Sequence, residues 1–196
     1  MSYKSLICPI EGNDREIDRA LTEIESFGKI EGLSDDKISK LRLVGEEIIG
    51  MAEGILQVEN GRFWIEKNED GYVERFACQA KVGDRARALF DATAENKEYR
   101  GLAGLVKKVV DAAERMIEVS SAASSNMGID IAYEGGSVMD ATGYVWSLDK
   151  YEEICERDEK VDKWDELELS VLKKLSKNIV VSYRNDRFDI EVYTDI

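Results

Sequence analysis

Histidine is absent from this chain of 196 residues. Its absence excludes Ser-His-Asp and Cys-His catalysis within the chain, histidine ligation of a metal, and a phospho-accepting histidine. Any acid-base chemistry must therefore fall to Asp, Glu, Lys, Tyr or Cys side chains.

Cysteine, proline and long apolar runs are also scarce. Cys8, Cys78 and Cys155 lie far apart and form no CxxC pair, so their spacing indicates neither a zinc site nor a disulfide framework. No apolar run approaches the roughly 18 residues that a membrane span needs. The stretch that ends at Pro9, the only proline, is too short for a signal peptide. We therefore expect a cytoplasmic protein with reduced thiols and no membrane partner.

Negative charge is abundant, with 41 acidic against 27 basic residues and a formal net charge of −14. This charge repels nucleic-acid phosphates and anionic lipid, so neither is an expected partner. A basic protein or a bound cation would be attracted, although plain solubility also explains an acidic surface. Hydrophobic residues make up 43%, enough for a sizeable core, and the length predicts a single domain over 1–196.

The hydrophobic periodicity alternates between strands and helices. Asn13 or Asp14 is expected to cap a first helix that ends near Gly28, and Ser34 a second, largely buried helix that ends near Gln57. The expected strands are 3–10, a hairpin of 62–68 and 72–81, a short strand at 129–133, and a final hairpin of 179–183 and 188–193. The other expected helices carry 102–116, 147–165 and 167–175.

The order of these elements is strand, helix, long buried helix, hairpin, variable middle, helix and hairpin. It resembles the GHKL (histidine kinase-like) ATPase domain, particularly that of anti-sigma-factor serine kinases. The resemblance covers about 3–82 and 164–194, and 83–163 would replace the ATP lid. It implies an α/β (α+β) two-layer sandwich, in which a mixed, mainly antiparallel sheet carries helices on one face.

The family's long helix carries a Glu and, four residues later, an Asn that holds Mg²⁺. One helical turn places both on one face. Glu47 matches the Glu, which in the family activates the attacking group, but Met51 stands where the Asn is expected. Taking Glu46 instead places Gly50 there. Neither a thioether nor a bare backbone replaces an amide oxygen on a hard cation.

The family's second site is an Asp-x-Gly at the end of the hairpin, whose carboxylate accepts from the adenine amino group. The best match is Lys81-Val82-Gly83. Lys81 only donates, so it cannot accept this hydrogen bond. Asp84 lies three residues late and would need a change of register to serve.

The third site is a Gly-x-Gly that brings backbone N–H groups to the phosphates at the start of the last helix. Glu166-Leu167-Glu168 aligns there. Each carboxylate would repel a triphosphate by roughly 1–4 kcal/mol at contact in a surface-like dielectric.

The three departures predict a regulatory protein-binding domain with a degenerate nucleotide site and no cofactor. The resemblance implies another protein as partner, such as a sigma factor or an anti-sigma-antagonist-like regulator. A first alternative is a divergent serine kinase or ATPase that uses Mg-ATP, with Glu47 as base and Asp84 in place of the adenine-binding Asp. A second alternative is a structural or dimerisation module that pairs through the helix around Leu105 and Val109, giving a homodimer.

Tryptophans and acidic residues supply the remaining candidates. Trp146 and Trp164 flank the charged helix and are predicted to bind a partner, whereas Trp64, in mid-strand, is expected in the core or on the sheet surface. Glu46 and Glu47 either point into a remnant pocket or lie at the helix edge beside a Lys or Arg. Clustered carboxylates could bind Ca²⁺ or Mg²⁺, but their spacing fits no EF-hand loop and a solvated acidic surface is the preferred interpretation. They are Asp130, Glu134, Asp140, Asp149, Glu152 and Glu153.

Overall fold

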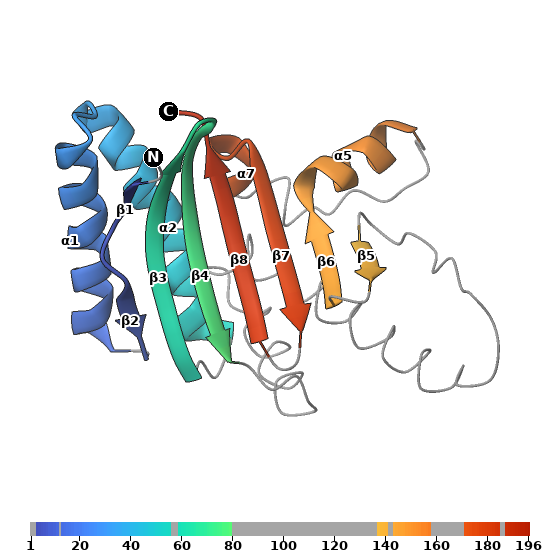
Figure 1. Ribbon diagram of the computed structural model, residues 1–196, viewed down its shortest axis with the longest axis horizontal. Helices are drawn as coiled ribbons and strands as arrows, with labels where there is room; N and C mark the ends of the chain where they lie inside the picture. The colour runs from blue at the N-terminus through green and yellow to red at the C-terminus, as the bar shows by residue number, and fades with distance from the viewer. Residues whose placement is uncertain are drawn as a thin grey trace.

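The computed structural model describes residues 3–11, 13–55, 59–79, 137–140, 143–157, 171–184 and 187–196. These residues form eight strands and four helices (Figure 1). In chain order they are β1 (Tyr3–Lys4), β2 (Cys8–Ile10), α1 (Asp14–Ile30), α2 (Asp35–Ile55), β3 (Glu59–Asn68), β4 (Gly71–Gln79), β5 (Ser137–Asp140), β6 (Gly143–Ser147), α5 (Leu148–Arg157), α7 (Val171–Leu175), β7 (Asn178–Arg184) and β8 (Arg187–Thr194).

Local signals explain where α1 begins and ends. The Asn13 side chain accepts a hydrogen bond from the Glu16 backbone N–H at 3.2 Å, which satisfies a donor that the helix itself cannot pair. Gly32 follows the helix with φ of +71°, a conformation that glycine adopts without a Cβ penalty. The predicted cap at Asn13 is confirmed.

The β3–β4 hairpin also follows from its turn residues. Asn68 pairs with Gly71 across the turn, and Gly71 has φ of +134°. A Cβ on Gly71 would lie 2.5 Å from the Thr194 carbonyl oxygen of β8, so both the backbone conformation and the space require glycine. The predicted hairpin is confirmed.

The strands form one sheet in the order β1-β3-β4-β8-β7-β6-β5, with β2 also paired to β3. Every strand pair in the described ranges is antiparallel. The expectation of a mixed sheet is therefore wrong for this part of the chain. The reason is that three of the pairs, β3–β4, β5–β6 and β7–β8, are hairpins, and β8 returns beside β4 in the opposite direction.

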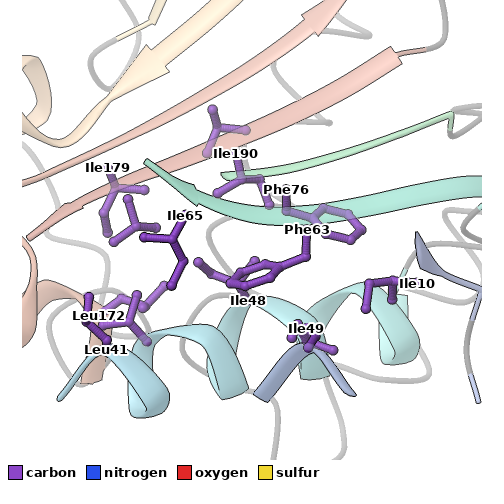
Figure 2. Packing of buried hydrophobic residues seen from close by; sticks show 14 of the residues in the cluster. Ile10, Leu41, Ile48, Ile49, Phe63, Ile65, Phe76, Leu172, Ile179 and Ile190 are labelled. Carbon is purple, nitrogen blue, oxygen red and sulfur yellow. The ribbon is translucent and has the colours of Figure 1, made fainter. Parts of the chain in front are cut away.

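The helices cover one face of this sheet, as predicted. A row of cross-strand partners runs over five strands and is fully or almost fully buried on the helix side. It packs with residues of α2 and α7 in a single core cluster, part of which Figure 2 shows. The row consists of Phe63, Phe76, Ile190, Val181 and Trp146. The described residues therefore form an α+β sandwich of one sheet and one helical layer.

The segment 83–163 contributes to this main sheet. Residues of β6 pair with β7, and Leu148 and Tyr151 of α5 belong to the same core cluster. β6 and α5 thus belong to the sheet and its core, and the expectation that 83–163 replaces a lid stays a prediction. The sequence pattern alone predicts no strand at 137–140 or at 143–147, where the structure has β5 and β6.

Among the described helices, none is long and apolar enough to cross a membrane. The predicted helix over 102–116, which carries Leu105 and Val109, and the predicted strand at 129–133 lie outside the described residues.

Candidate functional site

The two glutamates of the predicted nucleotide helix differ in their surroundings. Glu46 is exposed on α2 and pairs with Arg42, one turn earlier, at 3.0 Å between Nε and Oε1. Of the two expected positions for Glu46, the structure shows the helix edge beside an Arg and not a remnant pocket. Glu47 is half-buried. Met51 belongs to α2 four residues later, and its side chain lies outside the described part.

The other predicted nucleotide positions also lie outside the described residues. They are Lys81, Gly83, Asp84, Glu166 and Glu168. Trp164, predicted to bind a partner, falls outside as well. Of the predicted site residues, the structure therefore places only Glu47, Met51 and Trp146.

Trp146 lies in the core. Its exposed fraction is 0%, and its ring centroid lies 6.1 Å from that of Tyr151 in α5. The prediction that Trp146 binds a partner is therefore wrong, because β6 directs this side chain to the helix side of the sheet. The charged residues that follow Trp146 in the sequence include Asp149, Lys150 and Glu153, which lie on the solvent-exposed side of α5.

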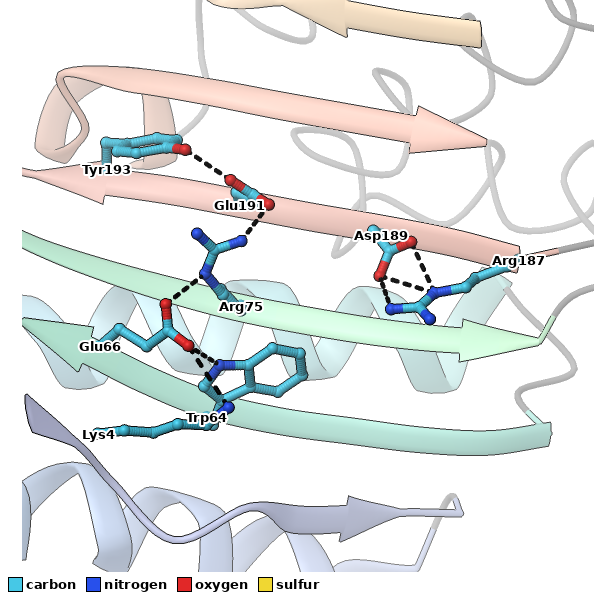
Figure 3. Close-up of polar contacts among 8 residues, drawn as sticks. All are labelled: Lys4, Trp64, Glu66, Arg75, Arg187, Asp189, Glu191 and Tyr193. Carbon is cyan, nitrogen blue, oxygen red and sulfur yellow. Dashed lines mark hydrogen bonds and ion pairs between the residues drawn. The ribbon is translucent and has the colours of Figure 1, made fainter. Parts of the chain in front are cut away.

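The opposite face of the sheet carries a connected group of polar and aromatic side chains, seen in Figure 3 on the side turned away from α2. We call this group the polar sheet face. Its central row is Trp64, Arg75 and Glu191, which are direct cross-strand partners on β3, β4 and β8. The complete group is Lys4, Trp64, Glu66, Arg75, Glu191 and Tyr193.

Two carboxylates hold the polar sheet face together. Glu66 accepts hydrogen bonds from Trp64 Nε1 and from Arg75 Nε, both at 2.9 Å. Glu191 pairs with the other end of the Arg75 guanidinium and accepts from the Tyr193 hydroxyl at 2.5 Å. The side chains of Glu66, Arg75 and Glu191 are each about one quarter exposed, at 25%, 26% and 26%. The group is thus both accessible and constrained.

Lys4 closes one side of this group. Its Nζ lies 3.4 Å from Glu66 Oε1 and 4.4 Å from the centroid of the Trp64 ring. The ammonium thus forms an ion pair and a cation–π contact at once. Two cations, Lys4 and Arg75, balance two anions, Glu66 and Glu191, although the whole chain is strongly acidic.

The pKa values of this group reflect the network. Burial alone would raise the pKa of Glu66, but the Trp64 hydrogen bond and the nearby Arg75 and Lys4 charges outweigh it and leave the pKa below its usual value. Burial, reinforced by the hydrogen bond to the Glu191 carboxylate, raises the pKa of Tyr193 to about 12. Glu66 is therefore ionised and Tyr193 is a neutral donor at physiological pH.

Glu74 is an unexpected acidic residue inside the core. It is fully buried on β4, and neither carboxyl oxygen has a hydrogen-bond partner in the described structure. Its cross-strand neighbours are Ile65 and Val192, which are also fully buried. Burial raises the pKa of Glu74 well above its ordinary value and so favours the neutral, protonated form of the side chain.

The acidic residues of the middle segment do not gather into a metal site in the part of the chain that is described, where no such cluster of ligating side chains occurs. Asp149 is instead occupied at the start of α5, where its carboxylate accepts from the Asn178 side chain at 2.5 Å. Asp130 and Glu134 lie outside the described residues.

The alternation of side chains between the two faces of a strand could have predicted both the buried Glu74 and the polar sheet face. Residues two apart on a strand share a face, so Glu74 had to join Phe76 toward the helices. Likewise Trp64 and Glu66 had to lie opposite Phe63 and Ile65. The pairing of β4 with β8 connects residues more than 100 positions apart, and no local pattern specifies it.

Comparison of the chain with known protein families, curated proteins and solved structures gives no significant match.

Proposed function

We propose that this chain is a regulatory protein-binding domain and that the polar sheet face is its contact surface. The observation that supports the proposal is that three side chains of the polar sheet face, Trp64, Arg75 and Tyr193, are held half-buried where no described helix covers them. Tryptophan, tyrosine and arginine are the residue types that contribute most to binding at protein interfaces.

The network also lowers the entropic cost of binding. Side chains that are already fixed by ion pairs and hydrogen bonds lose little rotamer freedom when a partner covers them. The balance of cations and anions matters too, because a partner meets a locally neutral surface on a chain of net charge −14. The surrounding negative charge would favour a partner with basic regions around its own contact surface.

The partner class rests on the resemblance to anti-sigma-factor serine kinases. It suggests a sigma factor or an anti-sigma-antagonist-like regulator as the protein bound. A cytoplasmic location suits this role, and Cys8, Cys78 and Cys155 are all free thiols, as expected in a reducing compartment.

We further propose that the domain does not hold ATP in the manner of the GHKL family, because Met51 offers no oxygen for Mg²⁺. The alternative is a divergent ATP-dependent serine kinase, and the half-buried position of Glu47 on α2 is the observation that favours it. Calorimetric titration with Mg-ATP separates the two. Micromolar binding that Glu47→Gln abolishes would establish the kinase alternative.

The contact surface is tested by affinity capture from a lysate of the producing cells. The immobilised wild-type chain is compared with Trp64→Ala and with Lys4→Ala, which removes the cation over the indole. The matched control is Arg157→Ala, at an exposed position of α5 away from the sheet face.

We expect mass spectrometry to identify a protein that wild type and the control retain and both sheet-face variants lose. Circular dichroism confirms that the variants are folded. A captured set that is unchanged by Trp64→Ala and Lys4→Ala would rule out this surface.

A further inference from the structure

One end of the sheet holds a pocket of about 440 Å³, where β3 begins and β4 ends. This volume falls within the range of roughly 300–1,000 Å³ that is typical of small-molecule sites. Its polar lining side chains come from β3, β4 and β8 and from the residue that follows β2. The polar lining side chains are Glu11, Asn60, Arg62, Gln79 and Arg187.

Arg62 brings an uncompensated cation to this pocket. Its side chain is exposed, and it takes part in no ion pair or hydrogen bond within the described ranges. A guanidinium presents several N–H donors in a planar fork that matches a carboxylate or a phosphate.

Arg187 supplies a second guanidinium whose orientation is fixed. Its Nη2 donates to Asp189 Oδ1 at 2.7 Å and its Nε to Asp189 Oδ2 at 2.8 Å. These bonds leave the remaining N–H groups of Arg187 free to donate to a ligand. Asp189 therefore acts as a support that neutralises Arg187 without using all its donors.

The amide side chains add further donors. Asn60 Nδ2 donates to Gln79 Oε1 at 3.2 Å, so the acceptor of Gln79 is used and its NH₂ group remains. Donors thus outnumber acceptors among the described lining residues, of which Glu11 is the only carboxylate. An excess of donors of this kind suits an anion.

The backbone at this point is irregular. Asn60 has φ of +56°, a left-handed conformation that costs energy for residues other than glycine, and the β3–β4 register shifts between Glu59 and Arg62. Bulges of this kind redirect side chains and recur beside binding sites. Here the bulge contains Asn60 and Gly61 and directly precedes Arg62, and all three of these β3 residues line the pocket.

We propose that this pocket binds a small organic anion, through a carboxylate or phosphate group held between Arg62 and Arg187. Glu11 selects for a ligand that also carries a hydroxyl or amino donor and disfavours a second negative charge on that side. The site is independent of protein binding on the polar sheet face, so either proposal can fail alone.

The test uses glycerate and glycerol 3-phosphate, two small hydroxylated anions that distinguish carboxylate from phosphate, at constant ionic strength set with sodium chloride. Binding is followed by calorimetry and by ¹H–¹⁵N NMR spectra of the full chain. We expect saturable binding of at least one probe, with the largest shifts at Asn60, Arg62, Gln79 and Arg187.

Arg62→Gln is expected to weaken that binding about tenfold or more, because it removes charged hydrogen bonds. Arg62→Lys keeps the charge but loses the fork and should give an intermediate affinity. Arg157→Gln, a neutralisation of equal size on α5, should leave the affinity unchanged.

The proposal fails if neither probe saturates below about 10 mM, an affinity weaker than most specific ligands show. It also fails if Arg62→Gln and Arg157→Gln weaken binding equally, or if the shifts map to another part of the chain.

Discussion

At the scale of single residues, Glu74 is the most unusual feature of the core. The carboxyl reaches toward α2 at Gly45, where a Cβ would lie 3.0 Å from its Oε2. Its neighbours on β3 and β8 are apolar, and burial is the cause of its raised pKa. The side chain is therefore tolerated in the core as a protonated acid, at a cost to stability that depends on pH.

Replacing Glu74 by Gln should stabilise the protein at neutral pH. Because the folded-state pKa of Glu74 is raised, its ionisation costs no stability below the pKa that it has in the unfolded chain. Stability then falls as pH rises toward the folded-state pKa, by about 1.4 kcal/mol per pH unit. Gln cannot ionise, so Glu74→Gln should gain up to about 3 kcal/mol at pH 7 and little at pH 4.5. Urea unfolding at the two pH values measures the difference.

Glu153→Gln serves as the control, because Glu153 is exposed on α5 and pairs only with Arg157 in the described structure. Its effect should be small and nearly the same at both pH values. A Glu74→Gln variant that loses equal stability at pH 4.5 and at pH 7 would show that Glu74 is ionised and paired in the folded protein.

At the scale of elements, α2 owes its close packing to the absence of a side chain at Gly45. A Cβ there would lie 2.3 Å from Ile24 Cδ1 of α1 as well as close to Glu74. Five residues later, on a different face of α2, Gly50 has open space, with nothing within 4 Å of its Cβ position. The same residue type therefore has two different roles on one helix.

Alanine at these two glycines should act in opposite directions. Gly50→Ala should raise the unfolding free energy by about 1 kcal/mol, because alanine favours the helix and meets no obstacle. Gly45→Ala gains the same preference but must displace buried Ile24, so we expect a net loss of about 1–2 kcal/mol. Thermal unfolding of the two variants tests this. Equal stabilisation by both would mean that α1 and α2 can separate at no cost.

Element prediction succeeded where the deciding residues are adjacent in the chain. Asn13 and Gly71 mark a helix start and a turn through their own backbone requirements, whatever the rest of the fold does. β5 and β6 were missed because they are short, with 4 and 5 residues, and depend on pairing, β5 with β6 and β6 with the distant β7. Trp146 was misjudged for the same reason, since the strand that buries it was not anticipated.

At the scale of the whole molecule, the net charge of −14 opposes the compact state. The excess acidic groups repel one another over long distances. Salt screens this repulsion, because the Debye length falls from about 10 Å at 0.1 M to about 3 Å at 1 M. The ion pairs of the polar sheet face are short-range and partly buried, so the same salt weakens them less.

Raising the salt concentration should stabilise the protein. We expect the melting temperature to rise by a few degrees between about 0.02 and 0.3 M sodium chloride, since screening relieves the self-repulsion. Choline chloride should give the same shift, because screening does not depend on the cation. A larger shift with sodium would indicate a specific cation site, and a fall in melting temperature would show that ion pairs such as Arg75–Glu191 outweigh the repulsion.

The sequence by itself determined the local features: the caps, the hairpins, the apolar faces of α1 and α2, and the acidic character of the surface. Each depends on residues a few positions apart or on composition alone. The tertiary structure decided the pairing of β4 with β8, the row that buries Trp146, and the meeting of Arg62 with Arg187 at one pocket. Those contacts join distant segments. They stabilise the protein only after the intervening chain has folded and brought the segments together, so no local stretch of sequence specifies them.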